Sequence, residues 1–252
     1  MTGELKYKEL ELPNYHNSRA IFAGLTVSDL AKAAVLGGLN LLLVGDTGSG
    51  KTQLASDIYQ HYFRGNKEEG GQGVFMRAHP DIDIYNEIFT KLNIEKKQRE
   101  LTNSLEAMIF WVDEINRAPP IGQNQFFGLG DGKMDYGGRE INIGRNGYRF
   151  LIATANIGNG EFSGTFDTDK ALFSRLHVTL NLEHAPMKPT YEDKEKIRKR
   201  KADPNVVTAH KRDISDKIAK AREEIRNATI NEDLETRAIL DYLEQGLQNC
   251  QS

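Results

Sequence analysis

The feature that most constrains the fold is a glycine-rich octapeptide between an apolar run, 41–44, and a stretch of helical composition, 53–62. A strand that turns through glycines into a helix points several backbone N–H groups inward, and these donors, with the helix dipole, bind a polyphosphate. In the spacing G-x-x-x-x-G-K-[ST], the lysine reaches the β- and γ-phosphates and the hydroxyl of the last residue coordinates Mg²⁺. The predicted nucleotide-binding residues are Gly45, Asp46, Thr47, Gly48, Ser49, Gly50, Lys51 and Thr52, which we call the phosphate loop.

The alternative interpretation is an ordinary glycine-rich turn. That interpretation does not explain why Lys51 and Thr52 stand where phosphate and metal chemistry requires them. We therefore expect a nucleotide and Mg²⁺ at this loop. ATP is the expected nucleotide because it is the common one. A base-reading motif such as Asn-Lys-x-Asp is not evident, which leaves GTP open.

An acidic pair, Asp113 and Glu114, follows the apolar, β-prone run 107–112. A run of this kind is typical of a strand buried on both faces of a parallel sheet, and open α/β sheets bind ligands at the carboxyl ends of their strands. We expect Asp113 to hold Mg²⁺, directly or through water, and Glu114 to orient and deprotonate the attacking water. The alternative is a carboxylate pair that only caps the next helix.

Asn156 ends a second apolar run, 148–155. A neutral amide in that place can hydrogen-bond the γ-phosphate or the attacking water without competing for the metal. The alternative is an asparagine that merely satisfies a turn. Together with the phosphate loop and the acidic pair, Asn156 predicts hydrolysis of a nucleoside triphosphate.

The order of the remaining patterns predicts an α/β fold in which helices flank a parallel sheet. The expected domains are an N-terminal arm, 1–25, a nucleotide-binding core, 26–184, and a small α-helical lid, 185–252. The expected elements are a helix from Thr26 to Gly37-Gly38, strands 39–44, 73–78 and 178–182, a helix from Pro80 that carries Ile84, Ile88 and Leu92, a short helix or extended insertion at 95–106, a hairpin at 133–143 and a short helix at 169–173.

Composition narrows the class of protein. No apolar stretch approaches the roughly 20 residues of a membrane span, and the N-terminus lacks a signal-peptide core, so we expect a cytoplasmic protein. The single cysteine, Cys250, excludes an intrachain disulfide and a cysteine metal cluster. The net charge of −3 argues against general nucleic-acid binding. A basic stretch, 194–226, favours a solvated helix face over a polyanion site because acidic residues are interspersed in it.

With these motifs in order, residues 20–182 resemble the MoxR-like branch of the AAA+ ATPases. The segment 111–120, with its Asn-Arg-Ala-Pro-Pro extension, is similar to that family's Walker B motif. Residues 153–156 and 164–166 are similar to its sensor 1 strand and the following loop. Residues 171–176 resemble the segment with the arginine finger, and residues 233–240 resemble the sensor 2 helix.

The resemblance implies a homo-oligomer, usually a hexameric ring, with ATP bound at each interface between subunits. Arg175 is then the finger that reaches the γ-phosphate held by the neighbouring subunit, and Arg237 contacts phosphate from the lid. By itself, Arg175 would be an ordinary salt-bridging residue.

For function, the resemblance implies a chaperone-like ATPase that remodels or activates a partner protein, often one with a von Willebrand A domain. A nucleic-acid motor, as in a restriction system, is one alternative, for which the basic stretch 194–226 would be the contact. A slow nucleotide-dependent assembly switch is another.

Two departures from the family pattern affect these expectations. The segment before 107–112 lacks the clear glycine-bearing hairpin that many MoxR-like proteins insert there, so pore-facing contacts are not carried over. The chain also stops about four helical turns after Arg237, which predicts a short or truncated lid.

Overall fold

The computed structural model divides into two compact units, Met1–Ile218 and Ala219–Ser252. Of the second unit the structure describes 219–227, the last residues of helix α8 (Ser215–Asn227). The loop 157–165, Arg237 and most of the predicted lid lie outside the described residues, so the lid stays a prediction. The structure describes residues 12, 20–22, 25–156, 166, 169–184, 187–188, 191–192, 195, 198–199 and 213–227.

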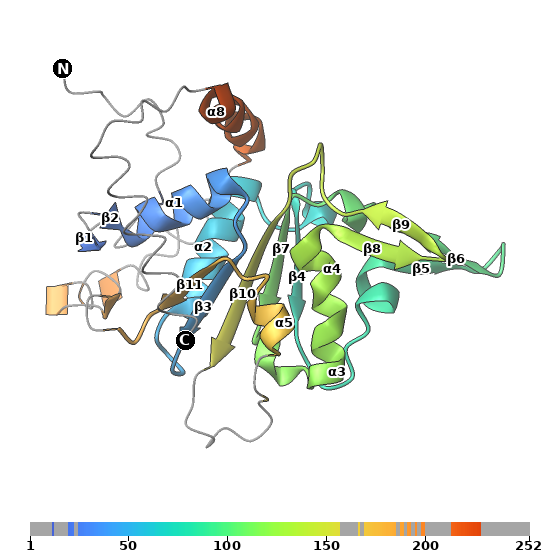
Figure 1. Ribbon diagram of the computed structural model, residues 1–252, viewed down its shortest axis with the longest axis horizontal. Coiled ribbons are helices and arrows are strands. Elements are labelled where there is room, and N and C mark those ends of the chain that lie inside the picture. The colour runs from blue at the N-terminus through green and yellow to red at the C-terminus, as the bar shows by residue number, and fades with distance from the viewer. Residues whose placement is uncertain are drawn as a thin grey trace. The chain divides into compact units, whose positions relative to one another are not determined.

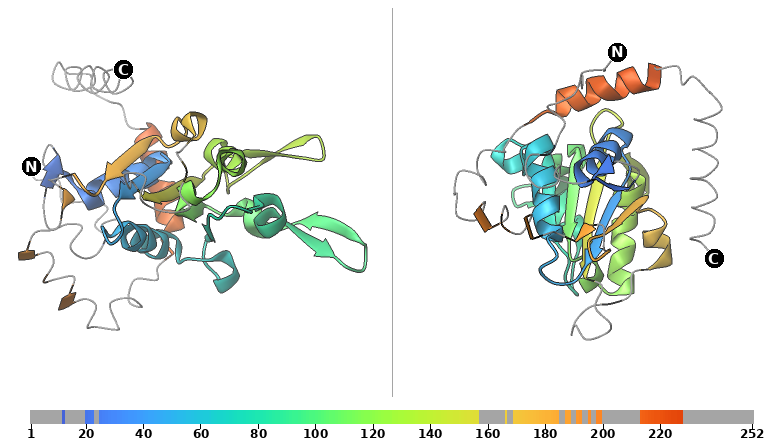
Figure 2. Two further views of the ribbon diagram at one scale, coloured as in Figure 1. Left: turned by 90° about the horizontal axis from the view of Figure 1, so that it is seen from below. Right: turned by 90° about the vertical axis from the view of Figure 1, so that its left-hand side faces the viewer.

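A five-stranded parallel sheet forms the core of the first unit, in the order β11-β3-β10-β7-β4 (Figure 1). Helix α2 covers one face of the sheet, and α4 and α5 lie on the other (Figure 2). The predicted parallel sheet flanked by helices is confirmed. The strands of this sheet are β3 (Leu41–Gly45), β4 (Gly73–Arg77), β7 (Ile109–Asp113), β10 (Phe150–Asn156) and β11 (Val178–Asn181).

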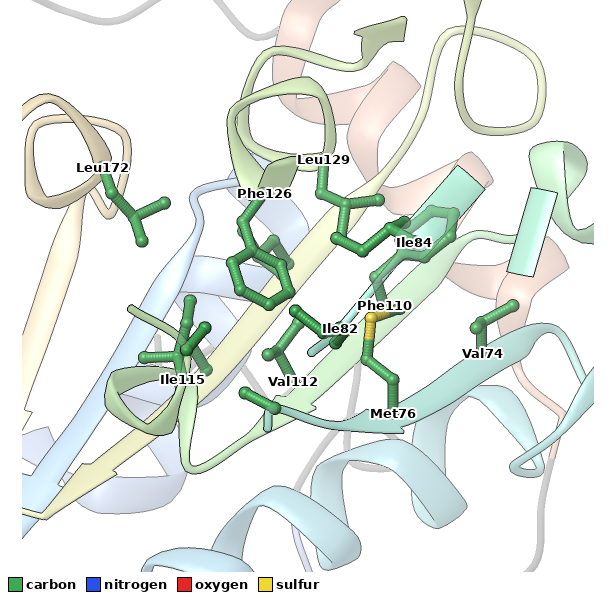
Figure 3. Close-up of a cluster of buried hydrophobic side chains, with 14 of the residues drawn as sticks. Val74, Met76, Ile82, Ile84, Phe110, Val112, Ile115, Phe126, Leu129 and Leu172 are labelled. Carbon is green, nitrogen blue, oxygen red and sulfur yellow. The ribbon is translucent and has the colours of Figure 1, made fainter. Parts of the chain in front are cut away.

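Continuous apolar runs produce the central strands because both of their faces are covered. Every residue of β3 and β7 is buried. On one face, Phe110 and Val112 of β7 pack with Phe126, Leu129 and Leu172 in a single apolar cluster (Figure 3). This packing holds the strand that ends at Asp113, and so it sets the position of the acidic pair.

The first two helices, on either side of β3 in the chain, begin and end near the predicted residues. Helix α1 (Val27–Gly37) begins with a capping box in which Thr26 and Asp29 bond each other's backbone N–H groups. It ends at Gly38, which has a left-handed backbone, as the Gly37-Gly38 signal predicts. Helix α2 (Lys51–Phe63) begins within the phosphate loop, so that Lys51 and Thr52 form its first turn, two residues before the predicted start at 53.

The predicted helix from Pro80 is wrong for most of its length. Helical structure is limited to a short π-helix at Tyr85–Phe89, and Leu92 lies in a strand. The strands β5 (Thr90–Asn93) and β6 (Gln98–Leu101) form an antiparallel hairpin. The apolar spacing of Ile84, Ile88 and Leu92 imitates a helix, but the Thr90 hydroxyl bonds the Tyr85 carbonyl oxygen at 2.8 Å where the chain changes to a strand.

The same hairpin lies before β7, where the sequence has no clear glycine-bearing hairpin. Of the two alternatives for 95–106, the chain is extended at Gln98–Leu101, and a short 3₁₀ helix follows at Asn103–Glu106. The turn of the hairpin contains no glycine, which is the signal that the prediction required. Lys97 takes the left-handed conformation instead, with φ of 52°. The Asn93 side chain closes the turn by accepting a hydrogen bond from the Lys96 N–H at 3.1 Å.

A second hairpin, β8 (Lys133–Tyr136) and β9 (Arg139–Asn142), confirms the prediction at 133–143. Gly137 and Gly138 form its tip with φ of 61° and 74°. Both hairpins extend beyond the sheet in the same direction (Figures 1 and 2). The Tyr136 hydroxyl donates to the Arg99 carbonyl oxygen at 3.3 Å, which joins the two hairpins.

Short elements complete the described fold. Asp169 caps the helix predicted at 169–173. None of the described helices is both long and apolar enough to cross a bilayer. The remaining elements are β1 (Ala20–Phe22), β2 (Leu25–Thr26), α3 (Pro120–Gln123), α4 (Phe127–Asp131), α5 (Lys170–Phe173) and 3₁₀ turns at Lys67–Glu69, Asn103–Glu106, Ile115–Arg117 and Asn124–Phe126.

Candidate nucleotide-binding site

The phosphate loop has the backbone that anion binding requires. Gly48 and Gly50 have φ of 86° and 94°, a conformation that side chains with a Cβ disfavour. A Cβ on Gly45 would lie 2.8 Å from the Ser49 hydroxyl oxygen, so the loop closes too tightly for a larger residue. Among the described residues, no side chain caps the start of α2. The first N–H groups of this helix are therefore available to a phosphate.

Lys51 places a cation at the centre of the loop. Its Nζ donates to the carbonyl oxygens of Gly45 at 2.8 Å and Asp46 at 2.7 Å, and to the Ser49 hydroxyl at 3.3 Å. Burial lowers the pKa of Lys51, while the charge of Asp46 and, less strongly, that of Glu183 oppose this shift. A desolvated ammonium bonded mainly to carbonyl oxygens is suited to receive the negative charge of phosphates.

Thr52 and Asp113 meet at the position predicted for the metal. The Thr52 hydroxyl lies 3.3 Å from Oδ1 of Asp113, although the two residues are 61 positions apart in the chain. The Asp113 side chain is buried. Mg²⁺ in nucleotide sites takes oxygen ligands, usually one or two carboxylates together with substrate phosphates and water. A carboxylate facing a hydroxyl beside the phosphate loop fits that requirement.

Glu114 follows β7, Asn156 ends β10, and their side chains meet between these two paired strands. Asn156 Nδ2 lies 3.4 Å from Oε1 of Glu114. Glu114 has a left-handed backbone, with φ of 54°, which is strained for a residue other than glycine. Its side chain also forms an ion pair with Arg117, in which Nε lies 2.9 Å from Oε2. The structure therefore brings together the residues predicted to position water.

Two residues that sequence reasoning missed hold these groups in place. The Thr154 hydroxyl donates to Oδ1 of Asp113 at 2.7 Å and accepts the backbone N–H of Glu114 at 2.8 Å. Asn116 donates from Nδ2 to the Asn156 carbonyl oxygen at 2.9 Å. Thr154 was detectable as the polar residue inside the apolar run 150–155. Asn116 belongs to the segment that carries the family resemblance, but no role was predicted for it.

Arg77 is a third residue that the sequence did not indicate. It ends β4, in register with Asp113 at the end of β7. Its Nη2 lies 3.4 Å from Oδ2 of Asp113. No local motif marks Arg77, because its proximity to the site depends on the pairing of β4 with β7.

The structure does not bring Arg175 to the phosphate loop of its own chain. The Arg175 carbonyl oxygen accepts from Nδ2 of Asn40 at 2.7 Å, and Asn40 stands just before β3, whereas the phosphate loop begins where β3 ends. Five residues at about 3.3 Å each separate these ends by roughly 16 Å. Arg175 Nε instead lies 2.8 Å from Oδ1 of Asp131, and the guanidinium carbon lies 4.5 Å from the centre of the Phe127 ring.

This fold and site define a class of protein: a parallel α/β nucleotide-binding fold in which a glycine-rich loop connects a central strand, β3, to a helix, and carboxylates stand at the end of β7, which β10 separates from β3. The family model described as the AAA domain of the dynein-related subfamily matches residues 40–176, more than half of the chain. The protein belongs to this AAA family.

One solved structure extends the likeness of the fold. It is a protein from Cytophaga hutchinsonii ATCC 33406 described as a "putative ATPase", with a TM-score of 0.60 and 20% sequence identity. The match covers 83% of the present chain and 60% of the other, so the chain spans less than two thirds of that protein. At this identity the likeness concerns the fold alone. A search of curated proteins found no match.

Proposed function

We propose that this protein is a MoxR-like AAA+ ATPase that hydrolyses ATP and uses a nucleotide-dependent ring to remodel or activate a partner protein. The observation that carries the proposal is the convergence of five side chains at the carboxyl ends of β3, β7 and β10. These are Lys51, Thr52, Asp113, Glu114 and Asn156, which come from the separate sequence motifs described above.

The phosphate loop and Lys51 bind the triphosphate in this proposal. The free N–H groups at the start of α2 receive the phosphate oxygens, and Nζ of Lys51 exchanges its carbonyl partners for the β- and γ-phosphates. Thr52 and Asp113 would hold Mg²⁺, and the ion would supply positive charge to neutralise the phosphate oxygens.

Glu114 is the proposed general base. Its carboxylate accepts the proton of the attacking water, and the Asn156 amide, 3.4 Å from Oε1, orients the carboxylate and the water. The ion pair with Arg117 must loosen when water takes its place beside the Glu114 carboxylate. Hydrolysis by this arrangement needs positioning and charge stabilisation but no covalent intermediate.

Arg175 acts between subunits in this proposal. Its place at the opposite edge of the sheet from the phosphate loop suits a residue that serves a neighbouring subunit, and the finger role predicts a ring of about six copies. Before assembly, Asp131 and Phe127 hold its guanidinium within its own chain. Arg237 is proposed to contact phosphate from the lid.

A partner protein is the proposed object of the motion. The two joined hairpins extend from the core, and Leu92 and Ile94 on the first of them are 61% and 82% exposed. Apolar side chains displayed on a protruding hairpin suit contact with protein better than contact with a polyanion. The MoxR-like resemblance favours a partner with a von Willebrand A domain.

Light scattering on the Glu114→Gln protein, with and without ATP and Mg²⁺, tests the ring. The variant should bind ATP without hydrolysing it, and its mass should rise to about six subunits when ATP and Mg²⁺ are added. The matched control is Lys51→Ala, which should stay small under both conditions. A persistent Glu114→Gln monomer that binds ATP would remove the ring mechanism and leave the nucleotide site. Retention of DNA that falls steeply with salt would favour a nucleic-acid motor instead.

A further inference from the structure

The two carboxylate oxygens of Asp113 have different partners. Oδ1 accepts from the Thr154 hydroxyl at 2.7 Å and from the Thr52 hydroxyl at 3.3 Å. Oδ2 faces Arg77, whose Nη2 lies 3.4 Å away. The Asp113 side chain is 3% exposed, whereas that of Arg77 is 64% exposed. A buried carboxylate therefore meets a cation that comes from the solvent side.

The positive charge of Arg77 compensates a carboxylate that burial would otherwise make costly. A buried charge without a partner destabilises a folded protein, and two neutral hydroxyls do not neutralise it. The other nearby cation, Lys51, makes its hydrogen bonds to the phosphate loop. Among the interactions described for Asp113, Arg77 supplies the ion pair.

We propose that Arg77 competes with Mg²⁺ for Asp113: it holds Oδ2 in the nucleotide-free protein and is displaced when Mg²⁺ and nucleotide enter together. The inference rests on the proposed function, because it assumes that Asp113 serves a metal. The metal position beside Thr52 faces Oδ1 and Arg77 faces Oδ2, but two cations on the same carboxylate still repel each other. Arg77 is therefore a positioning residue that lowers the affinity of the empty site for Mg²⁺.

The location of Arg77 allows it to leave. It ends β4, the last strand of the sheet, and its exposed side chain can move into solvent. A guanidinium stays charged throughout the physiological pH range, so the competition does not depend on protonation of the arginine. The nucleoside triphosphate favours replacement of Arg77 by Mg²⁺, because its phosphate oxygens are further ligands for the incoming metal.

The test measures Mg²⁺ dependence of nucleotide binding, not hydrolysis. The fluorescent non-hydrolysable analogue mant-AMPPNP is held at a fixed concentration while Mg²⁺ is titrated into the parent protein, Arg77→Gln and Arg77→Lys. The Mg²⁺ concentration at half-maximal binding should fall about threefold in Arg77→Gln, the size expected for loss of a solvent-exposed ion pair. Arg77→Lys, which keeps the charge, should stay within about twofold of the parent.

Arg117→Gln is the matched control, because it removes the same charge beside the same site but from the ion pair with Glu114. It should shift the midpoint less than Arg77→Gln does. Equal shifts would overturn the proposal in favour of a general field effect. Weaker nucleotide binding by Arg77→Gln would overturn it by indicating that Arg77 contacts phosphate.

A lower melting temperature of Arg77→Gln with an unchanged Mg²⁺ midpoint would also overturn the proposal, since Arg77 would then serve only to join β4 to β7. If the parent protein binds the analogue with a Mg²⁺ dependence that Arg77→Gln leaves unmoved, the competition is refuted and the proposed function stands. Absence of analogue binding by the parent itself would refute the proposed function and this inference with it.

Discussion

The two edges of the central sheet both contain polar side chains, but they use them differently. At the edge where the strands begin, Asn40 is fully buried and donates from Nδ2 to the carbonyl oxygens of Gly130 and Arg175 at 3.0 and 2.7 Å. Its Oδ1 accepts from Nη1 of Arg149 at 2.7 Å. These partners all come from the chain itself, so the network is complete without a ligand.

The edge where the strands end is arranged for an outside partner. Lys51 is buried with a lowered pKa, the helix after the phosphate loop begins without a side-chain cap, and Glu114 has a strained backbone. The first two features are unfavourable in the protein alone and favourable beside a triphosphate, and a strained backbone is typical of functional sites. The comparison teaches that polar residues alone do not mark the site. What marks the site is buried charge and backbone strain that the protein itself does not fully compensate.

Arg175→Ala gives the largest expected effect. It tests whether Arg175 only completes the network around Asn40 or also serves the nucleotide site of a neighbouring subunit. If Arg175 is an arginine finger as proposed, the variant should bind ATP but lose turnover by about 10³-fold or more. ATP hydrolysis is measured for Arg175→Ala, for Lys51→Ala and for mixtures of the two. Recovery of activity in mixtures would locate the finger across an interface. Lack of rescue at every ratio, with a lowered melting temperature, would assign Arg175 to a structural role with Asp131.

Lys51→Ala should reduce ATP affinity by about 10²- to 10³-fold, because several charge-assisted hydrogen bonds to phosphate are lost. The fold should survive, since the Lys51 partners in the free protein are two carbonyl oxygens and one hydroxyl, all of them uncharged. Nucleotide binding is measured by calorimetry and folding by thermal melting. Normal ATP affinity would contradict the assignment of the phosphate loop.

Asn40→Ala should lower the stability of the fold and leave ATP affinity nearly unchanged, the opposite of what is expected for Lys51→Ala. Loss of this side chain removes its hydrogen bonds to the carbonyl oxygens of Gly130 and Arg175 and to Nη1 of Arg149, at a cost of about 2 kcal/mol, although Nη2 of Arg149 still donates to the Gly130 carbonyl oxygen. The free energy of unfolding is measured in urea, with Asn142→Ala on the β9 strand as a control of similar chemistry. ATP affinity of the folded protein should stay within about twofold of the parent. A selective loss of ATP affinity would break the contrast between the two edges.

His177 gives the smallest expected effect. Its Nδ1 accepts the Asn40 backbone N–H at 2.9 Å, so the ring is neutral when bonded. Burial, and less strongly the charge of Arg149, lower the pKa of His177 below its ordinary value. The unfolded chain therefore binds the proton more readily. The stability that the neutral ring contributes is present above the ordinary pKa of about 6.5 and is lost as pH falls through the folded value.

His177→Gln should remove this component of the pH dependence, about 0.5 kcal/mol after allowance for solvent screening. The measurement compares urea unfolding of the two proteins at pH 7.5 and pH 5.5. The difference between them should narrow at the lower pH. A constant difference would contradict a lowered pKa of His177.

Much of the fold was predictable because its signals are local. The buried runs of β3, β7 and β10 have the length and composition of central strands, and Thr26 and Gly38 mark the ends of α1 within a few residues. The β5–β6 hairpin was not predictable in this way. Its turn uses Lys97 and Asn93 where the usual signal is glycine, and its apolar residues repeat at helical spacing.

The sequence by itself determined which residues stand at the ends of strands: Lys51 and Thr52 after β3, the acidic pair with β7, and Asn156 at the end of β10. These residues follow apolar runs directly in the chain, and the run by itself shows where its strand ends and in which direction it runs.

Only the tertiary structure decided which of those ends are neighbours. Placement of β10 between β3 and β7 brings Thr154 against Asp113, and pairing of β4 with β7 brings Arg77 to the same carboxylate. The same order leaves Arg175 at the opposite edge, beside Asn40. Strand order arises from the packing of segments far apart in the chain, and it is this long-range packing, with no signature in any short stretch, that completes the site.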